Sequence, residues 1–220
     1  MSEPGVVLKH DGDVPPALLG DWLDDRAIAW RLVEVERDGL PSLDGASWIA
    51  VLGSRHSTNA AEPAWIPAEI DLLRAAVADE VPVLGICFGS QALARALGGE
   101  VHPAPILEAA WDERIEVLDD ELPPGPWLNF HRESFTLPPA TTLLARSAAG
   151  PSAFRRGPHL GLQFHPEVTP EIALTWAERH RREHRLDLDL DELAAAGEAN
   201  REDAARRAFQ LFDRWWERLP

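Results

Sequence analysis

The 220-residue chain is predicted to form an α/β domain, with helices flanking a central, mostly parallel (mixed) sheet. Short, continuous apolar runs at 6–8, 48–52 and 82–86 are typical of strands covered on both faces, as in a parallel sheet. Segments with helical periodicity lie between these runs, which is the pattern of a doubly wound sheet. Apolar residues make up 45% of the chain and charged residues 26%, so a buried core is expected rather than disorder.

The first fifty residues give the start of this alternation. Pro15 and Pro16 open a predicted helix that extends to Leu23, because proline is well tolerated in a first helical turn. A β-rich segment follows at 30–35. The apolar run 48–52 is then a second buried strand and ends at Gly53.

The next fifty residues repeat the pattern. Pro67 opens a predicted helix, in which apolar residues recur every three or four positions and form one stripe. The stripe consists of Ile66, Ile70, Leu73 and Val77. A buried strand is expected at 82–86 and a helix at 91–97, which Gly98 and Gly99 end as a C-terminal cap.

The segment from 101 to 164 has a different pattern, with short β-like pieces separated by proline and glycine. These pieces lie at 115–118, 135–137, 142–146 and 160–164. They predict a mixed or antiparallel extension of the same sheet. A helix is expected from Pro170 to about His184, and a last helix from Asn200, its N-cap, to about Leu219. We therefore divide the chain into a domain at 1–184 and a C-terminal helical extension at 185–220, packed on the same domain.

Charge and composition exclude several classes of function. Acidic residues exceed basic ones by 37 − 21 = 16, which argues against a nucleic acid or an anionic membrane as the main partner. No apolar run approaches the roughly 20 residues of a membrane span, and the first twenty residues contain charges and prolines unlike a signal peptide. One cysteine excludes an internal disulfide and fits a reducing cytoplasm. The oligomeric state stays open.

Cys87, the single cysteine, lies between the strand at 82–86 and the helix at 91–97, with Gly85 and Gly89 two positions to either side. A sharp strand-to-helix turn of this kind exposes a side chain at the sheet edge. The helix N-terminus favours the thiolate, which matters because a free thiol has a pKa of about 8.5. The alternative is a buried structural cysteine, and these residues alone leave the two interpretations balanced.

His165 and Glu167 follow the strand predicted at 160–164. Residues two positions apart in an extended segment point the same way, so both side chains are expected to project together beyond the strand end. That arrangement suits a general base whose orientation is set by a carboxylate. A His-x-Glu pair is by itself more often a solvated surface pair. Combined with Cys87, it predicts a Cys-His-Glu triad.

Two segments resemble a known family. The stretch 82–99 (PVLGICFGSQALARALGG) and the stretch 161–168 (GLQFHPEV) are similar to the nucleophile and His-Pro-Glu motifs of class I (triad-type) glutamine amidotransferases. The resemblance covers roughly 6–182 and is nearest to stand-alone proteins like the amidotransferase domain of GMP synthase. It implies a flavodoxin-like fold and attack of a thiol on the γ-amide of glutamine, with a thioester intermediate and release of ammonia. Neither a metal nor an organic cofactor is expected.

The resemblance also implies roles for individual residues. Cys87 corresponds to the nucleophile, His165 to the base and later acid, and Glu167 to the residue that orients the histidine. The backbone N–H groups of Phe88 and Gly53 correspond to the oxyanion hole, where each such donor contributes about 3 kcal/mol.

Two further residues correspond to substrate-binding positions in the family. The amide of Gln91 would hold the amino acid end of the substrate, and His131 would lie near the pocket. From the sequence alone, Gln91 is equally an exposed helix glutamine and His131 a loop histidine without a catalytic role.

One turn departs from the family pattern. Gly53-Ser54-Arg55 stands where Gly-Gly-Pro is usual, which changes the flexibility of the turn. Arg55 and His56 either reach a substrate carboxylate or are solvated loop residues.

Three functions remain open at this stage. The chain is a glutaminase that supplies ammonia to a separate synthetase or ligase, since the residues after about 180 contain no glycine-rich phosphate loop. Alternatively, it is a free-standing hydrolase of γ-glutamyl amides or peptides with the same triad. The third alternative is a non-catalytic scaffold, which intact Cys87, His165 and Glu167 disfavour. Trp215 and Trp216 pack on their own domain or form a partner surface.

Overall fold

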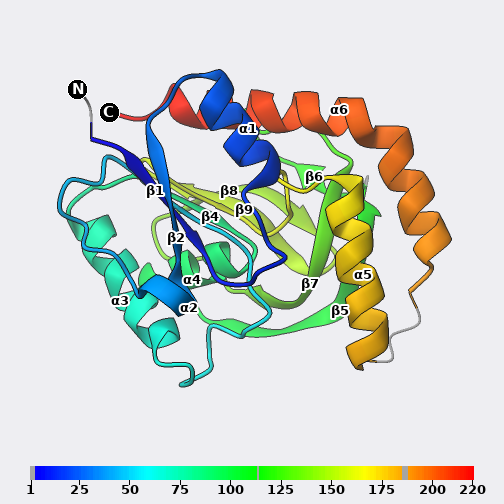
Figure 1. The fold of residues 1–220 in the computed structure, drawn as a ribbon, viewed down its shortest axis with the longest axis horizontal. Coiled ribbons are helices and arrows are strands. Elements are labelled where there is room, and N and C mark those ends of the chain that lie inside the picture. The colour runs from blue at the N-terminus through cyan, green and yellow to red at the C-terminus, as the bar shows by residue number, and fades with distance from the viewer. Residues whose placement is uncertain (1–2, 113, 185–187) are drawn as a thin grey trace.

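An eight-stranded mixed sheet runs through the molecule (Figure 1) in the computed structural model, which describes residues 3–112, 114–184 and 188–220. Its order is β2-β1-β3-β4-β10-β9-β8-β6. The strands are β1 (Gly5–Lys9), β2 (Trp30–Glu34), β3 (Ile49–Val51), β4 (Val83–Ile86), β6 (Glu116–Val117), β8 (Thr142–Ser147), β9 (Gly150–Arg156) and β10 (His159–Leu162). The first five in spatial order are parallel and the last three antiparallel. The expected α/β fold with a mostly parallel sheet is confirmed.

A second, two-stranded sheet was not predicted. Strand β5 (Val101–Asp112) pairs antiparallel with β7 (Trp127–Phe135), with an irregular register between Pro103 and Glu108. We expected this region to contribute only short additions to the main sheet, and that expectation was incomplete. Two prolines within β5 and its largely exposed side chains hide the strand, because proline and weak alternation both argue against a strand assignment.

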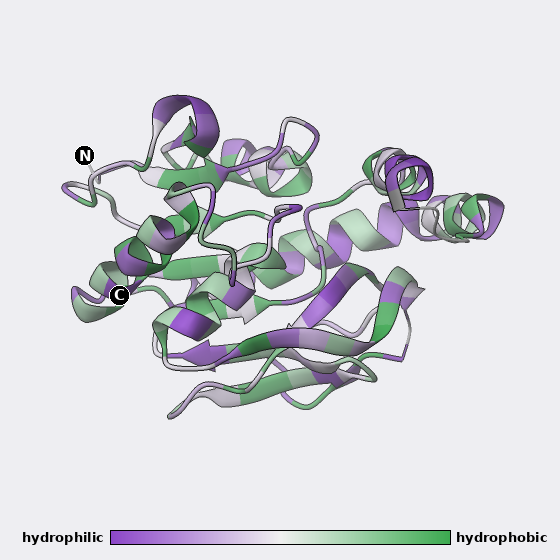
Figure 2. Ribbon diagram, turned by 90° about the horizontal axis from the view of Figure 1, so that it is seen from below, coloured by the Kyte–Doolittle hydropathy of each residue, from purple (hydrophilic) through white to green (hydrophobic). Residues whose placement is uncertain are grey.

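Helices cover both faces of the main sheet. They are α1 (Ala17–Asp25), α2 (Val35–Asp38), α3 (Trp65–Ala78), α4 (Phe88–Ala96), α5 (Pro170–His184) and α6 (Leu190–Trp216). Helices α1, α5 and α6 contribute to one buried apolar cluster, and α3 and α4 to the other. Figure 2 shows mostly hydrophobic central strands between these layers. Two helices begin slightly earlier than expected, α3 at Trp65 rather than Pro67 and α4 at Phe88 rather than Gln91.

The last helix begins ten residues before its predicted start at Asn200. The side chain of Asp189 caps α6 by accepting the N–H of Glu192 at 2.9 Å. Asn200 lies inside the helix, where its side chain donates to the carbonyl of Ala196 at 2.8 Å. The expected Asn200 cap was therefore wrong, because the Asp-x-x-Glu signal at 189–192 starts the helix earlier.

Helix α6 lies along the same face as α1 (Figure 1). Asp213 of α6 accepts hydrogen bonds from the indole of Trp22 at 2.9 Å and from the guanidinium of Arg26 at 2.8 Å. The first residues of the predicted extension, 185–187, lie outside the described residues. The division into 1–184 and 185–220 stays a prediction.

The tryptophan pair at the end of α6 packs against its own chain. Trp215 is 2% exposed, and its ring lies perpendicular to that of Trp48 with centroids 5.9 Å apart. Trp216 meets the ring of Trp22 at 6.0 Å. Edge-to-face contacts of this kind stabilise aromatic cores. In the part of the chain that the structure describes, no helix has the length and apolar character needed to cross a membrane.

Candidate active site

Cys87 occupies the sharp turn between β4 and α4. Its φ is +51°, an unfavourable backbone conformation for a residue with a side chain. The two flanking glycines are needed for close packing: a Cβ on Gly85 would lie 2.5 Å from the carbonyl oxygen of Gly89, and one on Gly89 would lie 2.1 Å from that of Val51. The turn thus combines a strained nucleophile position with backbone contacts that glycine alone permits.

The thiol of Cys87 reaches a pocket. Cys87 is 7% exposed and lines a cavity of about 170 Å³. Its backbone N–H donates to Leu162 of β10 at 2.7 Å, which joins the turn to the strand that leads to His165. Because Cys87 immediately precedes the first residue of α4, the positive end of the helix dipole lies beside the sulfur.

His165 and Glu167 meet beyond the end of β10. The ring Nδ1 of His165 lies 2.8 Å from Oε1 of Glu167, and the backbone N–H of His165 donates to Leu128 of β7 at 2.8 Å. Glu167 is completely buried. The carboxylate therefore fixes the ring orientation and leaves Nε2 to face the pocket.

The environment of His165 favours its protonated form. Burial alone would lower its pKa, but the charge of Glu167 and the charge and hydrogen bond of Cys87 outweigh burial and raise the pKa to about 10. The structure thus brings Cys87, His165 and Glu167 together. This arrangement stabilises an imidazolium beside a thiolate.

Gly53 lies directly beside this pair. A Cβ at Gly53 would be 3.1 Å from Cε1 of His165 and 3.9 Å from Cβ of Cys87. Gly53 and Phe88 both line the cavity. Within residues 3–112, 114–184 and 188–220, neither of their backbone N–H groups donates to a protein acceptor. Two unpaired donors beside a nucleophile are what an oxyanion hole requires.

Gln163 is a site residue that the sequence analysis missed. Its Nε2 donates to Sγ of Cys87 at 3.6 Å, and its Oε1 accepts from Nε2 of Gln91 at 3.1 Å. Gln91 also donates to the carbonyl of Glu133 at 3.3 Å and is 3% exposed, so it is not an exposed helix glutamine. The available signal was position, because Gln163 lies two residues before His165 in an extended segment.

His131 lies in the same cavity, on β7 rather than on a loop. Its Nε2 lies 3.0 Å from Oε2 of the buried Glu108 on β5, and its Nδ1 lies 3.1 Å from the carbonyl of Glu133. The second sheet therefore forms one wall of the cavity. Among the described residues, no three His, Cys, Asp or Glu side chains are grouped to hold a metal ion.

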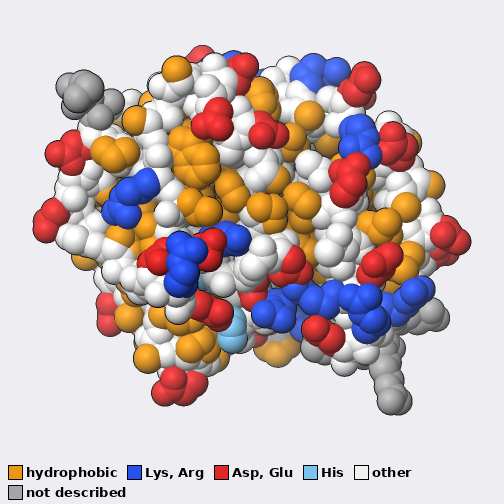
Figure 3. Space-filling view, in the orientation of Figure 1, with side chains coloured by type: hydrophobic (Ala, Val, Ile, Leu, Met, Phe, Trp, Pro, Cys, Tyr) orange, Lys and Arg blue, Asp and Glu red, His pale blue; other side chains and the backbone are white. Residues whose placement is uncertain are grey.

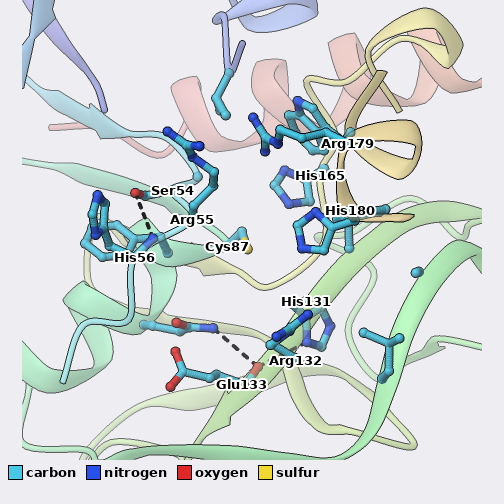
Figure 4. Close-up of a pocket in the computed structure, with 18 of the residues that line it drawn as sticks. Ser54, Arg55, His56, Cys87, His131, Arg132, Glu133, His165, Arg179 and His180 are labelled. Carbon is cyan, nitrogen blue, oxygen red and sulfur yellow. Dashed lines mark hydrogen bonds between the residues drawn. The ribbon is translucent and has the colours of Figure 1, made fainter. Parts of the chain in front are cut away.

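Basic side chains surround the mouth of the cavity. Figure 4 shows Cys87 between the Ser54–His56 turn on one side and His165 and His180 on the other, with Arg179 above. Arg55 donates to the buried Asp11 from both its backbone N–H, at 2.8 Å, and its Nε, at 2.7 Å.

The surface around the cavity contrasts with the acidic remainder. Figure 3 shows Lys and Arg side chains gathered in a row on one part of this face, while acidic groups are scattered. Arg132 and Arg179 also line the cavity. A cationic mouth on a chain of net charge −16 favours an anionic substrate.

The geometry agrees with a match to a known family. The model of the family "Glutamine amidotransferase class-I" matches residues 54–175, more than half of the chain. The chain belongs to this family. The match contains Cys87, His165 and Glu167 but begins one residue after Gly53.

Curated relatives of this amidotransferase are longer proteins. It is 43% identical over 95 residues to the glutamine-hydrolyzing GMP synthase of Thermomicrobium roseum, a match that covers 40% of this chain and 18% of that protein. It is 38% identical over 97 residues to a protein of Ignicoccus hospitalis that is named as one subunit of a glutamine-hydrolyzing GMP synthase, which covers 40% of this chain and 51% of that one. The amidotransferase thus matches about a fifth to a half of these relatives' length.

Solved structures match the whole amidotransferase chain. The crystal structure of a glutamine amidotransferase from Methylobacillus flagellatus has a TM-score of 0.89 and 26% identity, and covers 100% of this chain and 96% of that one. A glutamine amidotransferase from Thermotoga maritima has a TM-score of 0.88 and 23% identity, with 99% of both chains covered, and shows a shared fold. These matches include α6, so the C-terminal helix is part of the shared architecture.

Proposed function

We propose that the chain hydrolyses the γ-amide of glutamine through a γ-glutamyl thioester on Cys87 and releases ammonia. The observation that carries the proposal is the contact of Cys87 with His165, which Glu167 orients within one cavity. A nucleophile, a base and an orienting group in hydrogen-bond contact are the required parts of acyl transfer.

In the first half of the reaction, the thiolate of Cys87 attacks the γ-carbonyl carbon, and the carbonyl oxygen becomes an oxyanion. The N–H groups of Gly53 and Phe88 bind this oxyanion. His165, as imidazolium, then gives its proton to the leaving nitrogen, so that the C–N bond breaks and ammonia departs. The γ-glutamyl group remains on the sulfur as a thioester.

In the second half, His165 acts as a base. It takes a proton from a water molecule, which attacks the thioester carbonyl. The C–S bond then breaks, glutamate leaves, and the proton returns to the Cys87–His165 pair. Glu167 holds the imidazole ring in the same orientation throughout.

Substrate recognition is assigned to the walls and mouth of the cavity. Gln91 and His131 face it from α4 and β7, and we propose that they hold the amino acid end of glutamine. Arg55, Arg132 and Arg179 at the mouth supply positive charge for the substrate carboxylate. Because the reaction needs a free thiol, the proposed setting is a reducing compartment such as the cytoplasm.

The ammonia acceptor is proposed to belong to a separate synthetase. The relative from Ignicoccus hospitalis is named as one subunit of GMP synthase, and the aligned part of the Thermomicrobium roseum protein is less than a fifth of its length. An amidotransferase chain of this size leaves the synthetase reaction to another protein.

A second candidate is hydrolysis of other γ-glutamyl amides or peptides by the same triad. Arg55 lines the cavity directly beside Gly53, where it would meet a carboxylate on a larger leaving group. A panel of γ-glutamyl compounds assayed for glutamate release separates the candidates. Glutamine as the one good substrate would eliminate the second.

Covalent labelling tests the proposed function. Incubation with a chloromethyl ketone analogue of glutamine should modify Cys87, with a thioether formed and chloride released, as read by mass spectrometry. His165→Ala should abolish the modification, while His159→Gln, a change at a buried histidine away from the cavity, should preserve it. An unmodified wild-type Cys87 would refute the proposal.

A further inference from the structure

Two consecutive residues after β1, His10 and Asp11, both bind the turn that follows β3. Strands β1 and β3 are paired in parallel, so their carboxyl ends lie side by side. Nδ1 of His10 lies 3.3 Å from the carbonyl oxygen of Gly53. The carboxylate of Asp11 accepts from the backbone N–H and Nε of Arg55 at 2.8 and 2.7 Å. The turn is thereby held on both sides of Ser54.

His10 belongs to a fully buried ion pair. Its Nε2 lies 2.8 Å from Oε2 of Glu69 on α3, and both side chains have no exposed surface. Both ring nitrogens therefore face oxygen acceptors, which an imidazole satisfies only when both carry a proton. Burial alone would lower the pKa of His10, but the charge and hydrogen bond of Glu69 and the bond to Gly53 raise it.

The same ring also contacts the second residue of the proposed oxyanion hole. It meets Phe88 edge-on with centroids 4.9 Å apart, and it stacks on Trp65 with centroids 4.7 Å apart and planes inclined by 18°. His10 thus contacts Gly53 and Phe88, the two residues whose backbone N–H groups are assigned to the oxyanion. Buried ion pairs often add little to stability, so a placement beside the reacting groups requires another explanation.

The turn cannot fix its own backbone. Gly53 has no Cβ to restrict its dihedral angles, and neither Ser54 nor Arg55 is a proline. On the basis of the proposed glutaminase activity, we propose that His10, Glu69 and Asp11 are positioning residues that hold the Gly53–Arg55 turn where the N–H of Gly53 binds the oxyanion. Glu69 holds His10, His10 holds the carbonyl of Gly53, and Asp11 holds the far end of the turn.

The experiment compares two reactions of the same sulfur. Labelling by the chloromethyl ketone analogue of glutamine passes through attack on a carbonyl, which forms an oxyanion. Alkylation by iodoacetamide displaces iodide at a saturated carbon and forms none. His10→Gln, Glu69→Gln and Asp11→Asn should slow the ketone reaction at least about tenfold, less than the hundredfold or more that follows loss of a whole donor. Alkylation should stay within about twofold, because the position and thiolate state of Cys87 are unchanged.

Steady-state kinetics give the same test during turnover. In the three variants, kcat for glutamine should fall in parallel with the ketone rate, while KM stays near the wild-type value, because the turn acts on the transition state. His159→Gln is the matched control, a buried histidine in the same sheet that does not line the cavity. Should His10→Gln fail to fold, the double variant His10→Gln/Glu69→Gln replaces the buried charges by two amides that can bond to each other.

The outcomes separate the two proposals. Variants whose two rates both match the wild type overturn the positioning role and leave the proposed function intact. Variants in which both rates fall together also overturn it, because the defect then lies in Cys87 or in the fold. A wild-type protein that iodoacetamide alkylates but that neither hydrolyses glutamine nor reacts with the ketone overturns the proposed function and this role with it.

Discussion

The amide of Gln163 donates a hydrogen bond to the sulfur of Cys87 at 3.6 Å. Its carbonyl oxygen is in turn held by the amide of Gln91, which comes from the helix that follows Cys87. Gln163 is 1% exposed, so the donor is desolvated and fixed. A fixed donor at this place stabilises negative charge on the sulfur, in addition to the charge of His165.

Replacement of Gln163 tests this contact. Gln163→Leu removes the donor and should slow alkylation of Cys87 by iodoacetamide about tenfold at neutral pH, because a charge-directed hydrogen bond contributes about 1.5 kcal/mol or more. The rate constant is measured by mass spectrometry. Gln210→Leu, at an exposed position on α6, is the control and should react like the wild type. Equal rates in both variants would show that Gln163 does not stabilise the thiolate.

Glu167 is expected to be essential for the orientation of His165. Glu167→Gln keeps the shape but loses the charge that favours the imidazolium. Release of glutamate from glutamine should fall about 10²- to 10⁴-fold in kcat, with KM little changed. Exposed Glu183→Gln on α5 is a suitable control. An almost fully active Glu167→Gln enzyme would remove the carboxylate from the mechanism.

The raised pKa of His165 predicts a pH dependence of stability. Its pKa is about 10 in the fold, whereas an unfolded histidine has a pKa of about 6.5. The folded state thus holds the proton more tightly, so the contribution to stability is complete below about pH 6.5 and is lost as the pH rises through about 10. The free energy of unfolding from urea titrations should fall between neutral and alkaline pH more steeply in the wild type than in His165→Gln.

A second histidine provides the control for this titration. Burial and the charge of Arg156 lower the pKa of His159 to about 4, so His159 stays neutral across the same range. His159→Gln should therefore keep the wild-type slope. If His165→Gln keeps it as well, the protonated pair is absent from the folded state.

Helix α6 is predicted to unfold together with the rest of the chain. Asp213→Ala removes the acceptor of the buried Trp22 indole and of Arg26 and should destabilise the protein by about 1–3 kcal/mol, as loss of a buried hydrogen-bond partner does. Asp203→Ala, on the exposed side of α6, should cost less than about 0.5 kcal/mol. Thermal unfolding followed at two wavelengths should show one transition. Two separate transitions would mean that the extension is an independent unit.

The sequence indicated those parts of the site that lie in local motifs. The elbow at Cys87 was recognisable because a buried run, two glycines and a helix follow each other within a few residues. His165 and Glu167 were recognisable from their spacing after a strand. The alternation of strands and helices in the first hundred residues likewise predicted the parallel half of the sheet.

The remaining parts depend on contacts between distant segments. His10 and Asp11 meet the Gly53–Arg55 turn about forty positions later in the chain. Such contacts leave no local pattern, since they arise from the parallel pairing of β1 with β3. The wall formed by β5 and β7 was hidden by prolines and exposed side chains, and with it the ion pair of His131 with Glu108.

The most direct test of the mechanism is the capture of the acyl-enzyme. The wild-type protein is mixed with isotopically labelled glutamine, quenched in acid within one turnover and digested for mass spectrometry. The labelled γ-glutamyl group should be found on the peptide that contains Cys87, and ammonia should appear before glutamate. Cys87→Ala should carry no label and release no ammonia. Ammonia release by Cys87→Ala at the wild-type rate would contradict the thioester mechanism.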